Sequence, residues 1–348
     1  MRAVVLQGER SVSVEDVPDA GLPGPDGVVV RIERTAICGS DLHLYHGGLG
    51  GVGVHLGHEF VGIVEDAGPE VRTVRAGDRV LVSGVIGCGR CVACLARDPV
   101  LCRNGPPRVF GVGTDLHGGQ AEAAAVPAAD AFCLPIPDGV SVEQAVLLTD
   151  ILPTGYLGAQ RADIRAGDTV VVIGLGPVGV FALQCAQLHG PSRILAVDVV
   201  PDRLARAEQL GAEPVDAAAG GGTVAQVMER TIGRGAAAVI EAVGSDQTMT
   251  DALLCAAAGG TVSVIGVNIN PAFAFPVPLA LMRRLTFRVT LASVPSAWEA
   301  LVPLVASGRL QPEEVFTHRM GLSEAAEAYR LFDAREDGVL KVLLDPGR

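Results

Sequence analysis

Regular alternation of apolar runs and helix-like segments is the feature that most constrains this chain. A continuous apolar run at 169–173 ends in glycines, and a helix-like segment at 177–188 follows it. The order then repeats, with runs at 193–198, 237–243 and 261–265 and helix-like segments at 202–210, 223–231 and 246–257. Strands without a polar face belong in a parallel sheet that helices cover on both sides. We therefore predict a doubly wound α/β domain over residues 150–286.

The residues on either side of this domain differ from it in composition and in the pattern of their apolar runs. Residues 1–149 are rich in glycine and proline and carry short β-like runs, such as 27–32, 60–65 and 79–83, between turn residues. That pattern is typical of a mainly antiparallel β domain. Residues 287–348 return to mixed helix and strand, and we expect them to pack against the first domain. With 348 residues, of which 49% are hydrophobic, the chain is large enough to bury two cores.

Charge and hydropathy argue against several classes of protein. The formal net charge is −12 and Lys341 is the only lysine, so the basic surface that a nucleic acid requires is not expected. We find no apolar run long enough to span a bilayer and no secretory leader, so we expect no membrane partner and a cytoplasmic location.

Four of the eight cysteines lie within fifteen residues, with the spacing C-x2-C-x2-C-x7-C. They are Cys88, Cys91, Cys94 and Cys102. In a reducing compartment such crowding indicates metal binding rather than disulfides. Four thiolates close a tetrahedral shell, so we predict a structural zinc in a lobe at about residues 87–103. An iron–sulfur cluster, which uses similar spacing, is the alternative.

A glycine-rich motif joins the run at 169–173 to the helix that follows. Its residues are Gly174, Gly176, Pro177, Val178 and Gly179. Glycines in a G-x-G-x-x-G pattern allow a tight turn and let a pyrophosphate approach the helix N-terminus. Asp198 ends the next strand, nineteen residues after Gly179, where a carboxylate binds the adenosine ribose hydroxyls and repels a 2′-phosphate. The motif therefore predicts a dinucleotide site that favours NAD over NADP.

Three further residues are candidate cofactor contacts. Val243 ends one apolar run and Gly266 follows another, so both are expected at the carboxyl ends of parallel strands, where ligands bind. Arg203 lies one helical turn into the element after Asp198. It either approaches the adenosine ribose or is an ordinary exposed helix arginine.

The motif Gly57-His58-Glu59-x-x-Gly62, continued by Gly68 and Val71, resembles the signature of the zinc-containing alcohol dehydrogenases of the medium-chain dehydrogenase/reductase superfamily. The resemblance covers essentially the whole chain, including the segment 38–43, the four-cysteine lobe, the segment 154–156 and the glycine motif. Segments 118–122 and 148–155 look closest to the bacterial branch near threonine dehydrogenases and glutathione-independent formaldehyde dehydrogenases. The resemblance implies a GroES-like, mainly β catalytic domain at 1–149, an inserted Rossmann domain at 150–286 and a C-terminal return at 287–348.

The same resemblance implies a second, catalytic zinc ion in each subunit, held by Cys38, His58 and Asp150. Many members have cysteine where this chain has Asp150. One thiolate, one neutral imidazole and one carboxylate make a formally neutral zinc shell, whereas a further permanent carboxylate would weaken the metal as a Lewis acid. We therefore interpret Glu59 as a transient or nearby ligand. Taken singly, each of these residues is also compatible with an ordinary buried or capping role.

The resemblance also assigns the chemistry. A hydride would pass from a zinc-bound alkoxide to the nicotinamide of NAD, and a proton would leave through Ser40, the nicotinamide ribose and His43. The backbone near Val267 would recognise the carboxamide, and Lys341 would meet the pyrophosphate.

The predicted function is an NAD-linked, zinc-dependent oxidoreductase that interconverts a small alcohol and its aldehyde or ketone. The alternative within enzymes is an aldehyde dismutase or epimerase that keeps its NAD bound and recycles it. A nucleotide-binding protein without catalysis is disfavoured, because all the candidate catalytic residues are present together. We expect a homodimer or homotetramer, with an exposed edge strand within 262–278 available for pairing between subunits.

Overall fold

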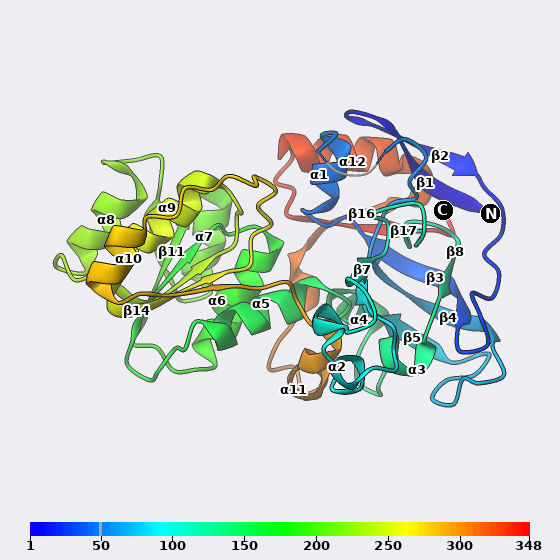
Figure 1. Cartoon of the computed structure of the whole chain (residues 1–348). Coiled ribbons are helices and arrows are strands. Elements are labelled where there is room, and N and C mark those ends of the chain that lie inside the picture. The colour runs from blue at the N-terminus through cyan, green and yellow to red at the C-terminus, as the bar shows by residue number, and fades with distance from the viewer. Residues whose placement is uncertain (49–50) are drawn as a thin grey trace. The chain divides into compact units, whose positions relative to one another are not determined.

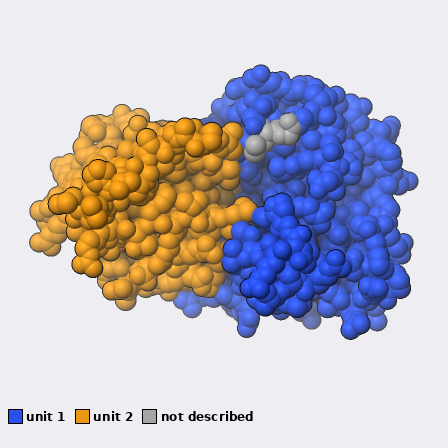
Figure 2. Space-filling view, in the orientation of Figure 1, with its two compact units in different colours: residues 1–153, 293–348 blue, residues 154–292 orange. Residues whose placement is uncertain are grey.

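Figure 1 shows the computed structural model of the chain, which describes residues 1–48 and 51–348. The chain divides into two compact units, coloured separately in Figure 2. Unit 1 comprises residues 1–153 and 293–348, and unit 2 comprises residues 154–292. The bounds expected from the sequence, 149 and 286, lie a few residues before these divisions. Among the described residues, no helix combines the length and apolarity needed to cross a membrane.

Unit 2 contains a six-stranded, fully parallel sheet. Its strands are β10 (Thr169–Ile173), β11 (Arg193–Asp198), β12 (Glu213–Asp216), β13 (Ala236–Glu241), β14 (Ala256–Val264) and β15 (Thr286–Val289). They are ordered β12-β11-β10-β13-β14-β15. The chain therefore turns to opposite sides of β10, and the carboxyl ends of β10 and β13 flank the point of reversal, where ligands bind in such sheets.

The helices of unit 2 follow the strands in the alternating order that the sequence predicts. They are α5 (Ile151–Arg161, which enters from unit 1), α6 (Pro177–Gln187), α7 (Pro201–Gln209), α8 (Gly222–Arg230), α9 (Asp246–Cys255) and α10 (Val277–Arg283). Helix α6 begins with Gly176 as N-cap and Pro177 in the first turn, a position where the missing proline N–H costs no hydrogen bond. The motif thus starts a helix directly after a buried strand.

The prediction of an edge strand within 262–278 is wrong. Strand β14 ends at Val264 and is paired on both sides, since Val262 lies opposite Val239 of β13 and Phe287 of β15. On this side of the sheet the edge strand is β15 instead, and β12 forms the opposite edge. The apolar run was recognised correctly, but its burial between two neighbours depends on the later strand at 286–289.

Unit 1 is built on a seven-stranded sheet with the order β16-β17-β3-β4-β5-β9, and β8 also pairs with β3. The sheet strands are β3 (Val28–Ala36), β4 (Glu59–Ala67), β5 (Arg79–Val82), β8 (Ala123–Val126), β9 (Cys133–Pro135), β16 (Phe316–Gly321) and β17 (Lys341–Asp345). Most pairings are antiparallel, and β16 with β17 is parallel. Strand β17 pairs with β3, so the C-terminal return completes the sheet that holds the N-terminal residues.

Shorter elements surround this sheet. The remaining strands are β1 (Arg2–Gly8), β2 (Ser11–Asp16), β6 (Val85–Ile86) and β7 (Arg108–Val109). The helices are α1 (Asp41–Tyr45), α2 (Val92–Leu95), α3 (Ala129–Phe132), α4 (Val142–Leu147), α11 (Val294–Ala306) and α12 (Ala325–Ala334), with short 3-10 turns at Pro99–Leu101, Pro312–Val315 and Leu322–Glu324.

Two apolar clusters hold unit 1 together. One contains Phe60 and Phe110, whose rings meet edge to face with centroids 5.1 Å apart. The other joins residues of β1 and α1 to α12, where the Tyr45 and Tyr329 ring centroids lie 5.4 Å apart. Because β4 begins at Glu59, the packed sheet fixes the backbone of Glu59 and of His58 before it.

Candidate metal centres and nucleotide-binding site

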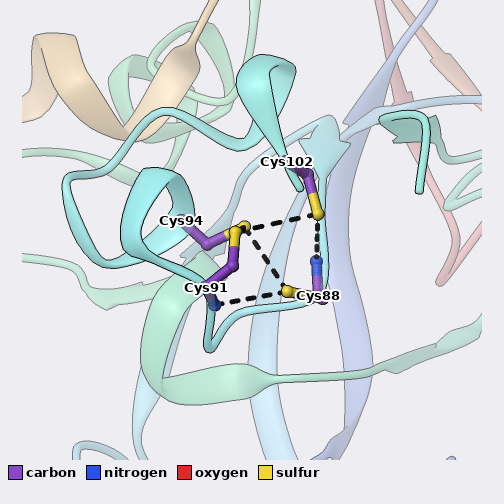
Figure 3. Close-up of side chains that lie close together, drawn as sticks. All are labelled: Cys88, Cys91, Cys94 and Cys102. Atoms are coloured by element: carbon purple, nitrogen blue, oxygen red, sulfur yellow. Dashed lines mark hydrogen bonds between the residues drawn. The ribbon is translucent and has the colours of Figure 1, made fainter. Parts of the chain in front are cut away.

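The four clustered cysteines converge in one lobe of unit 1 (Figure 3). Cys91 Sγ lies 3.6 Å from Cys94 Sγ and 4.0 Å from Cys102 Sγ, and Cys88 Sγ lies 4.0 Å from Cys94 Sγ. Four sulfurs about 2.3 Å from one zinc ion in a tetrahedron would be separated by about 3.8 Å. The spacing of the thiols therefore fits a closed, four-coordinate metal site.

The surroundings of these thiols also favour a bound cation. Backbone N–H groups donate hydrogen bonds to the sulfurs of Cys91 and Cys88. The bond from Arg103 N to Cys91 Sγ is the largest cause that lowers the pKa of Cys91 to about 6. Burial raises the pKa of Cys94 to about 12. A buried thiol of this kind gives up its proton only to a strong positive charge, which a metal ion supplies.

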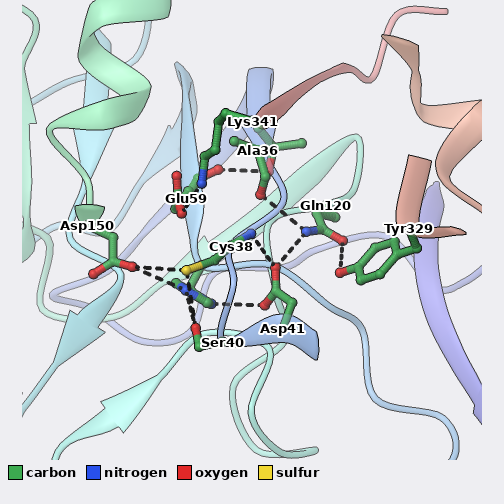
Figure 4. A network of polar contacts seen from close by, with 11 residues as sticks. Ala36, Cys38, Ser40, Asp41, Glu59, Gln120, Asp150, Tyr329 and Lys341 are labelled. Atoms are coloured by element: carbon green, nitrogen blue, oxygen red, sulfur yellow. Dashed lines mark hydrogen bonds and ion pairs between the residues drawn. The ribbon is translucent and has the colours of Figure 1, made fainter. Parts of the chain in front are cut away.

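A second group of metal-binding side chains comes from three separate parts of unit 1 (Figure 4). Cys38 follows β3, His58 and Glu59 stand at the start of β4, and Asp150 directly precedes α5. Each residue offers a donor atom, and these atoms all lie within 4.8 Å of one another. The structure thus brings together all four residues of the predicted catalytic zinc site.

Distances within this group fit a tetrahedral ion. His58 Nε2 lies 3.3 Å from Asp150 Oδ2, and Cys38 Sγ lies 3.6 Å from the same oxygen. For zinc bonds of about 2.0 Å to nitrogen and oxygen and about 2.3 Å to sulfur, these separations should be about 3.3 and 3.5 Å. Burial alone would lower the pKa of His58, but Asp41 and Cys38 hold it well above its usual value. The group therefore attracts positive charge.

Ser40 lies beside these donor atoms, as the predicted proton path requires. Its hydroxyl is 3.2 Å from Cys38 Sγ and 3.2 Å from His58 Nε2. His43 is half-buried in α1, one turn further along the chain. A proton path from Ser40 to His43 stays a prediction.

Glu59 and Lys341 form a buried ion pair. Lys341 Nζ donates to Glu59 Oε1 at 2.6 Å, and both side chains are completely buried. Burial would lower the pKa of Lys341, but the Glu59 carboxylate outweighs this effect and the pKa is raised. Glu59 Oε2 is buried without a hydrogen-bond partner among the described residues. This geometry holds Glu59 at the edge of the donor group, with one oxygen committed to Lys341.

Lys341 has a partner in unit 1 that the sequence did not predict. We predicted a contact with the pyrophosphate of NAD, but the ammonium has no exposed surface and is bound to Glu59 within unit 1. The pairing of β17 with β3 places Lys341 there, which the local sequence does not reveal. The structure places Lys341 beside the metal centre, and its contact with the pyrophosphate stays a prediction.

The glycine motif of unit 2 forms a tight turn between β10 and α6. Gly174 has a φ of +89°, which favours glycine. A Cβ at Gly179 would lie 1.8 Å from the Gly174 carbonyl oxygen, and a Cβ at Gly174 would lie 2.4 Å from Val243 Cγ2. By contrast, a Cβ at Gly176 would meet only Arg203 Nη1, at 3.8 Å. Gly174 and Gly179 thus serve the turn, and Gly176 leaves open space for a ligand.

Asp198 is held rigidly at the end of β11. Its Oδ2 accepts a hydrogen bond from Leu175 N at 2.7 Å, and its Oδ1 accepts from Val199 N and Val200 N at 2.8 and 3.0 Å. Arg203 Nη1 lies 3.7 Å from Asp198 Oδ2. The carboxylate therefore sits against the glycine turn, and Arg203 is its neighbour rather than a fully exposed side chain.

The other predicted cofactor residues lie on two touching loops after β13 and β14. Val243 and Val267 are both more than two-fifths exposed. A Cβ at Gly266 would lie 2.2 Å from Gly244 N, so the two loops pack closely. The structure brings Val243, Gly266 and Val267 to the carboxyl edge of the sheet, beside the glycine turn.

Comparison with known proteins agrees with both units. Residues 24–138 match the alcohol dehydrogenase GroES-like domain family, and residues 177–307 match the zinc-binding dehydrogenase family. A probable zinc-binding alcohol dehydrogenase of Mycobacterium tuberculosis is 49% identical over 99% of this chain and 89% of its own length. The chain belongs to the zinc-containing medium-chain alcohol dehydrogenase family.

Solved structures of two relatives have the same fold. The alcohol dehydrogenase from Thermus sp. ATN1 is 42% identical, with a TM-score of 0.92 and coverage of 99% of both chains. A zinc-binding dehydrogenase from Sinorhizobium meliloti, solved with NADP, is 31% identical, with a TM-score of 0.85 and coverage of 99% of both chains. Membership of this alcohol dehydrogenase family indicates zinc, rather than an iron–sulfur cluster, as the metal of the four-cysteine lobe.

Sequence reasoning missed three residues of this dehydrogenase's metal centre. Asp41 contacts His58, with Asp41 Oδ1 3.2 Å from His58 Nδ1, and Gln120 and Tyr329 extend the contact (Figure 4). Asp41 lies three residues after Cys38, which is a local signal for it. Gln120 and Tyr329 have no such signal, because they reach the site from distant segments.

Two glycine variants of the nucleotide site should behave differently. Gly179→Ala is expected to lower both the melting temperature and the affinity for NADH, because the new methyl group collides with the Gly174 backbone. Gly176→Ala is expected to lower NADH affinity more than 10-fold while leaving the melting temperature within a few degrees, because it fills only the ligand space. Thermal unfolding and NADH fluorescence titration measure both effects. If Gly176→Ala binds NADH as the wild type does, no pyrophosphate lies on this turn.

Proposed function

We propose that the chain is an NAD-linked alcohol dehydrogenase that interconverts an alcohol and its aldehyde or ketone. The observation that carries this proposal is the donor set of Cys38, His58 and Asp150, in which Cys38 and His58 are buried and the distances suit zinc. Unit 2 supports it with a glycine turn and a fixed carboxylate at the switch point of a parallel sheet. The named relatives support the zinc-dependent dehydrogenase class.

Within this proposal the chain's own residues bind, orient and move a proton. When bound, zinc supplies a Lewis acid that polarises the oxygen of the substrate. Ser40 Oγ, 3.2 Å from both Cys38 Sγ and His58 Nε2, takes up the proton of the substrate hydroxyl while it passes its own proton to the nicotinamide ribose. His43, in the helix that begins at Asp41, then receives a proton from the ribose. Glu59, whose Oε1 accepts a hydrogen bond from Lys341, stands beside the donor set as a nearby carboxylate.

The proposed preference for NAD rests on Asp198. Three backbone N–H groups fix its carboxylate, which would repel a 2′-phosphate on the adenosine ribose. Arg203, 3.7 Å away, would favour the phosphate, so the two side chains oppose each other. The carboxylate dominates because it is held in place and is directed at the turn.

Removing the negative charge of Asp198 should reduce the preference of the protein for NADH over NADPH. We expect wild-type enzyme to bind NADH at least tenfold more tightly than NADPH, and Asp198→Asn to bring the two affinities within a few-fold of each other. Fluorescence titration with each reduced cofactor measures the ratio, with Asp202→Asn as a matched exposed control in α7. Equal affinities in the wild type would overturn the NAD assignment.

Absorbance of NADH at the start of turnover tests the function itself. Purified protein with NAD and a panel of primary, secondary and polyhydroxy alcohols should form NADH with at least one class. If no alcohol forms NADH, NAD stays bound through purification and aldehyde is consumed without added cofactor, the dismutase or epimerase alternative would replace this function. If no alcohol of the panel forms NADH, and the protein holds two zinc ions but no nucleotide, the substrate lies outside the panel. That result would count against a general alcohol dehydrogenase.

Three further aspects belong to the proposal. We propose a homodimer or homotetramer, since α10 and the edge strand β15 expose Val277, Leu281, Met282 and Val289 at 61, 72, 82 and 66%. Light scattering measures the mass in solution.

None of the eight cysteines forms a disulfide, which favours a reducing, cytoplasmic location. The branch near threonine and formaldehyde dehydrogenases rests on segments 118–122 and 148–155 alone.

A further inference from the structure

A series of buried polar side chains leads from α12 to His58 (Figure 4). The Tyr329 hydroxyl donates to Gln120 Oε1 at 2.8 Å, and Gln120 Nε2 donates to Asp41 Oδ2 at 3.1 Å. Asp41 Oδ1 lies 3.2 Å from His58 Nδ1. Tyr329, Gln120 and Asp41 have no exposed surface. Solvent therefore supplies no substitute hydrogen bond when one member is removed.

The contacts of Gln120 fix the direction of its amide. Its Nε2 donates to the Ala36 carbonyl at 3.2 Å as well as to Asp41, so both acceptors lie on the side of the amide nitrogen. Its Oε1 faces the Tyr329 hydroxyl, which must then be the donor. Burial, together with the Asp41 carboxylate, raises the pKa of Tyr329 well above its usual value, so the hydroxyl keeps its proton.

Gln120 in turn limits the rotation of the Asp41 carboxylate. Asp41 Oδ2 accepts from Gln120 Nε2 and from Cys38 N, the latter at 2.9 Å. With Oδ2 held by two donors, Oδ1 lies 3.2 Å from His58 Nδ1, and neither of these two atoms has a hydrogen bond among the described residues. A histidine that binds a metal through Nε2 carries its proton on Nδ1, and a carboxylate at Nδ1 fixes the ring and raises its basicity as a ligand.

We propose that Gln120 and Tyr329 are positioning residues for the catalytic zinc, because they hold the carboxylate that orients His58. Neither touches substrate or cofactor in this role, and both act through Asp41. The C-terminal return thereby contributes to metal binding, since Tyr329 belongs to α12 and Gln120 to the segment before β8. The inference rests on the metal site of the proposed function.

The rate of zinc loss from the intact enzyme tests this role. Wild-type protein with two zinc ions per chain is exposed to a chromogenic chelator, and the release of each ion is followed. Tyr329→Phe keeps the buried ring and removes only the hydroxyl, and we expect it to release the catalytic zinc about 10-fold faster. Gln120→Met, which removes both ends of the link, should act in the same direction with a larger effect. The four-cysteine zinc is the internal control and should leave at the wild-type rate.

Tyr45→Phe is the matched control variant, because Tyr45 is buried beside Tyr329 but its hydroxyl is not part of this series. It should release zinc as the wild type does. Cobalt at the catalytic site gives a second readout, and its thiolate and ligand-field bands should shift in Tyr329→Phe but not in Tyr45→Phe. Equal release from both tyrosine variants, or equal acceleration at both zinc sites, would overturn the proposal. A wild type holding one zinc ion would instead refute the catalytic site itself.

Discussion

Asp150→Asn is expected to lower kcat about a thousandfold and to reduce the zinc content from two ions per chain toward one. The carboxylate lies 3.3 Å from His58 Nε2 and 3.6 Å from Cys38 Sγ, where it would complete the neutral zinc shell that we propose. With a neutral amide the shell would be positively charged and would bind zinc weakly. The stabilisation of charge on the substrate oxygen, about several kcal/mol, would then be lost. Metal analysis and steady-state kinetics with the best alcohol measure both changes.

NADH binding is the control for this variant. Because the glycine turn and Asp198 belong to unit 2, Asp150→Asn should bind NADH with an affinity close to that of the wild type. Asp138→Asn removes an exposed carboxylate of unit 1 and should leave zinc content and kcat unchanged. Full activity with two zinc ions in Asp150→Asn would remove Asp150 from the metal shell.

Cys94→Ser is expected to cause the largest loss of stability. Cys94 is the most buried thiol of the four-cysteine lobe, and its Sγ contacts the sulfurs of Cys88 and Cys91. Binding of a structural zinc contributes about 10 kcal/mol or more in small zinc domains, and most of that free energy is lost with one thiolate. We expect the melting temperature of unit 1 to fall by well over 10 °C, or the protein to aggregate on expression.

A second buried thiol of the same unit separates zinc loss from simple loss of packing. Cys133 is also buried and free but lies outside the metal lobe. Cys133→Ser should cost about 1–3 kcal/mol, the usual penalty for placing a hydroxyl in an apolar site. Differential scanning calorimetry with zinc analysis measures both variants. A similar loss in both would mean that the lobe holds no stabilising metal.

Local patterns made much of this molecule predictable. The glycine motif depends on the steric limits of one turn, and the four cysteines lie close together in the sequence, so spacing alone indicates their chemistry. The alternation of apolar runs with helical segments similarly indicates the parallel sheet of unit 2. In each case the decisive interactions join residues that are near neighbours along the chain.

The contacts around the catalytic donor set were less predictable, because they join distant segments. Lys341 and Glu59 are 282 residues apart, and their ion pair exists because β17 pairs with β3 beside β4. Tyr329 and Gln120 are 209 residues apart. No periodicity or motif in either segment records such a pairing. Similarly, the edge of the unit 2 sheet was misplaced because it depends on which later strand covers β14.

Because Lys341 is buried, cleavage of the chain at this residue can measure how often unit 1 unfolds. A lysine-specific protease has a single bond to cut, since the sequence contains one lysine. That bond lies in β17, which is paired with β16 on one side and β3 on the other. Cleavage therefore follows the population of molecules in which unit 1 has opened, without any engineered label. The extent of digestion at increasing urea concentrations gives the stability of the catalytic unit directly.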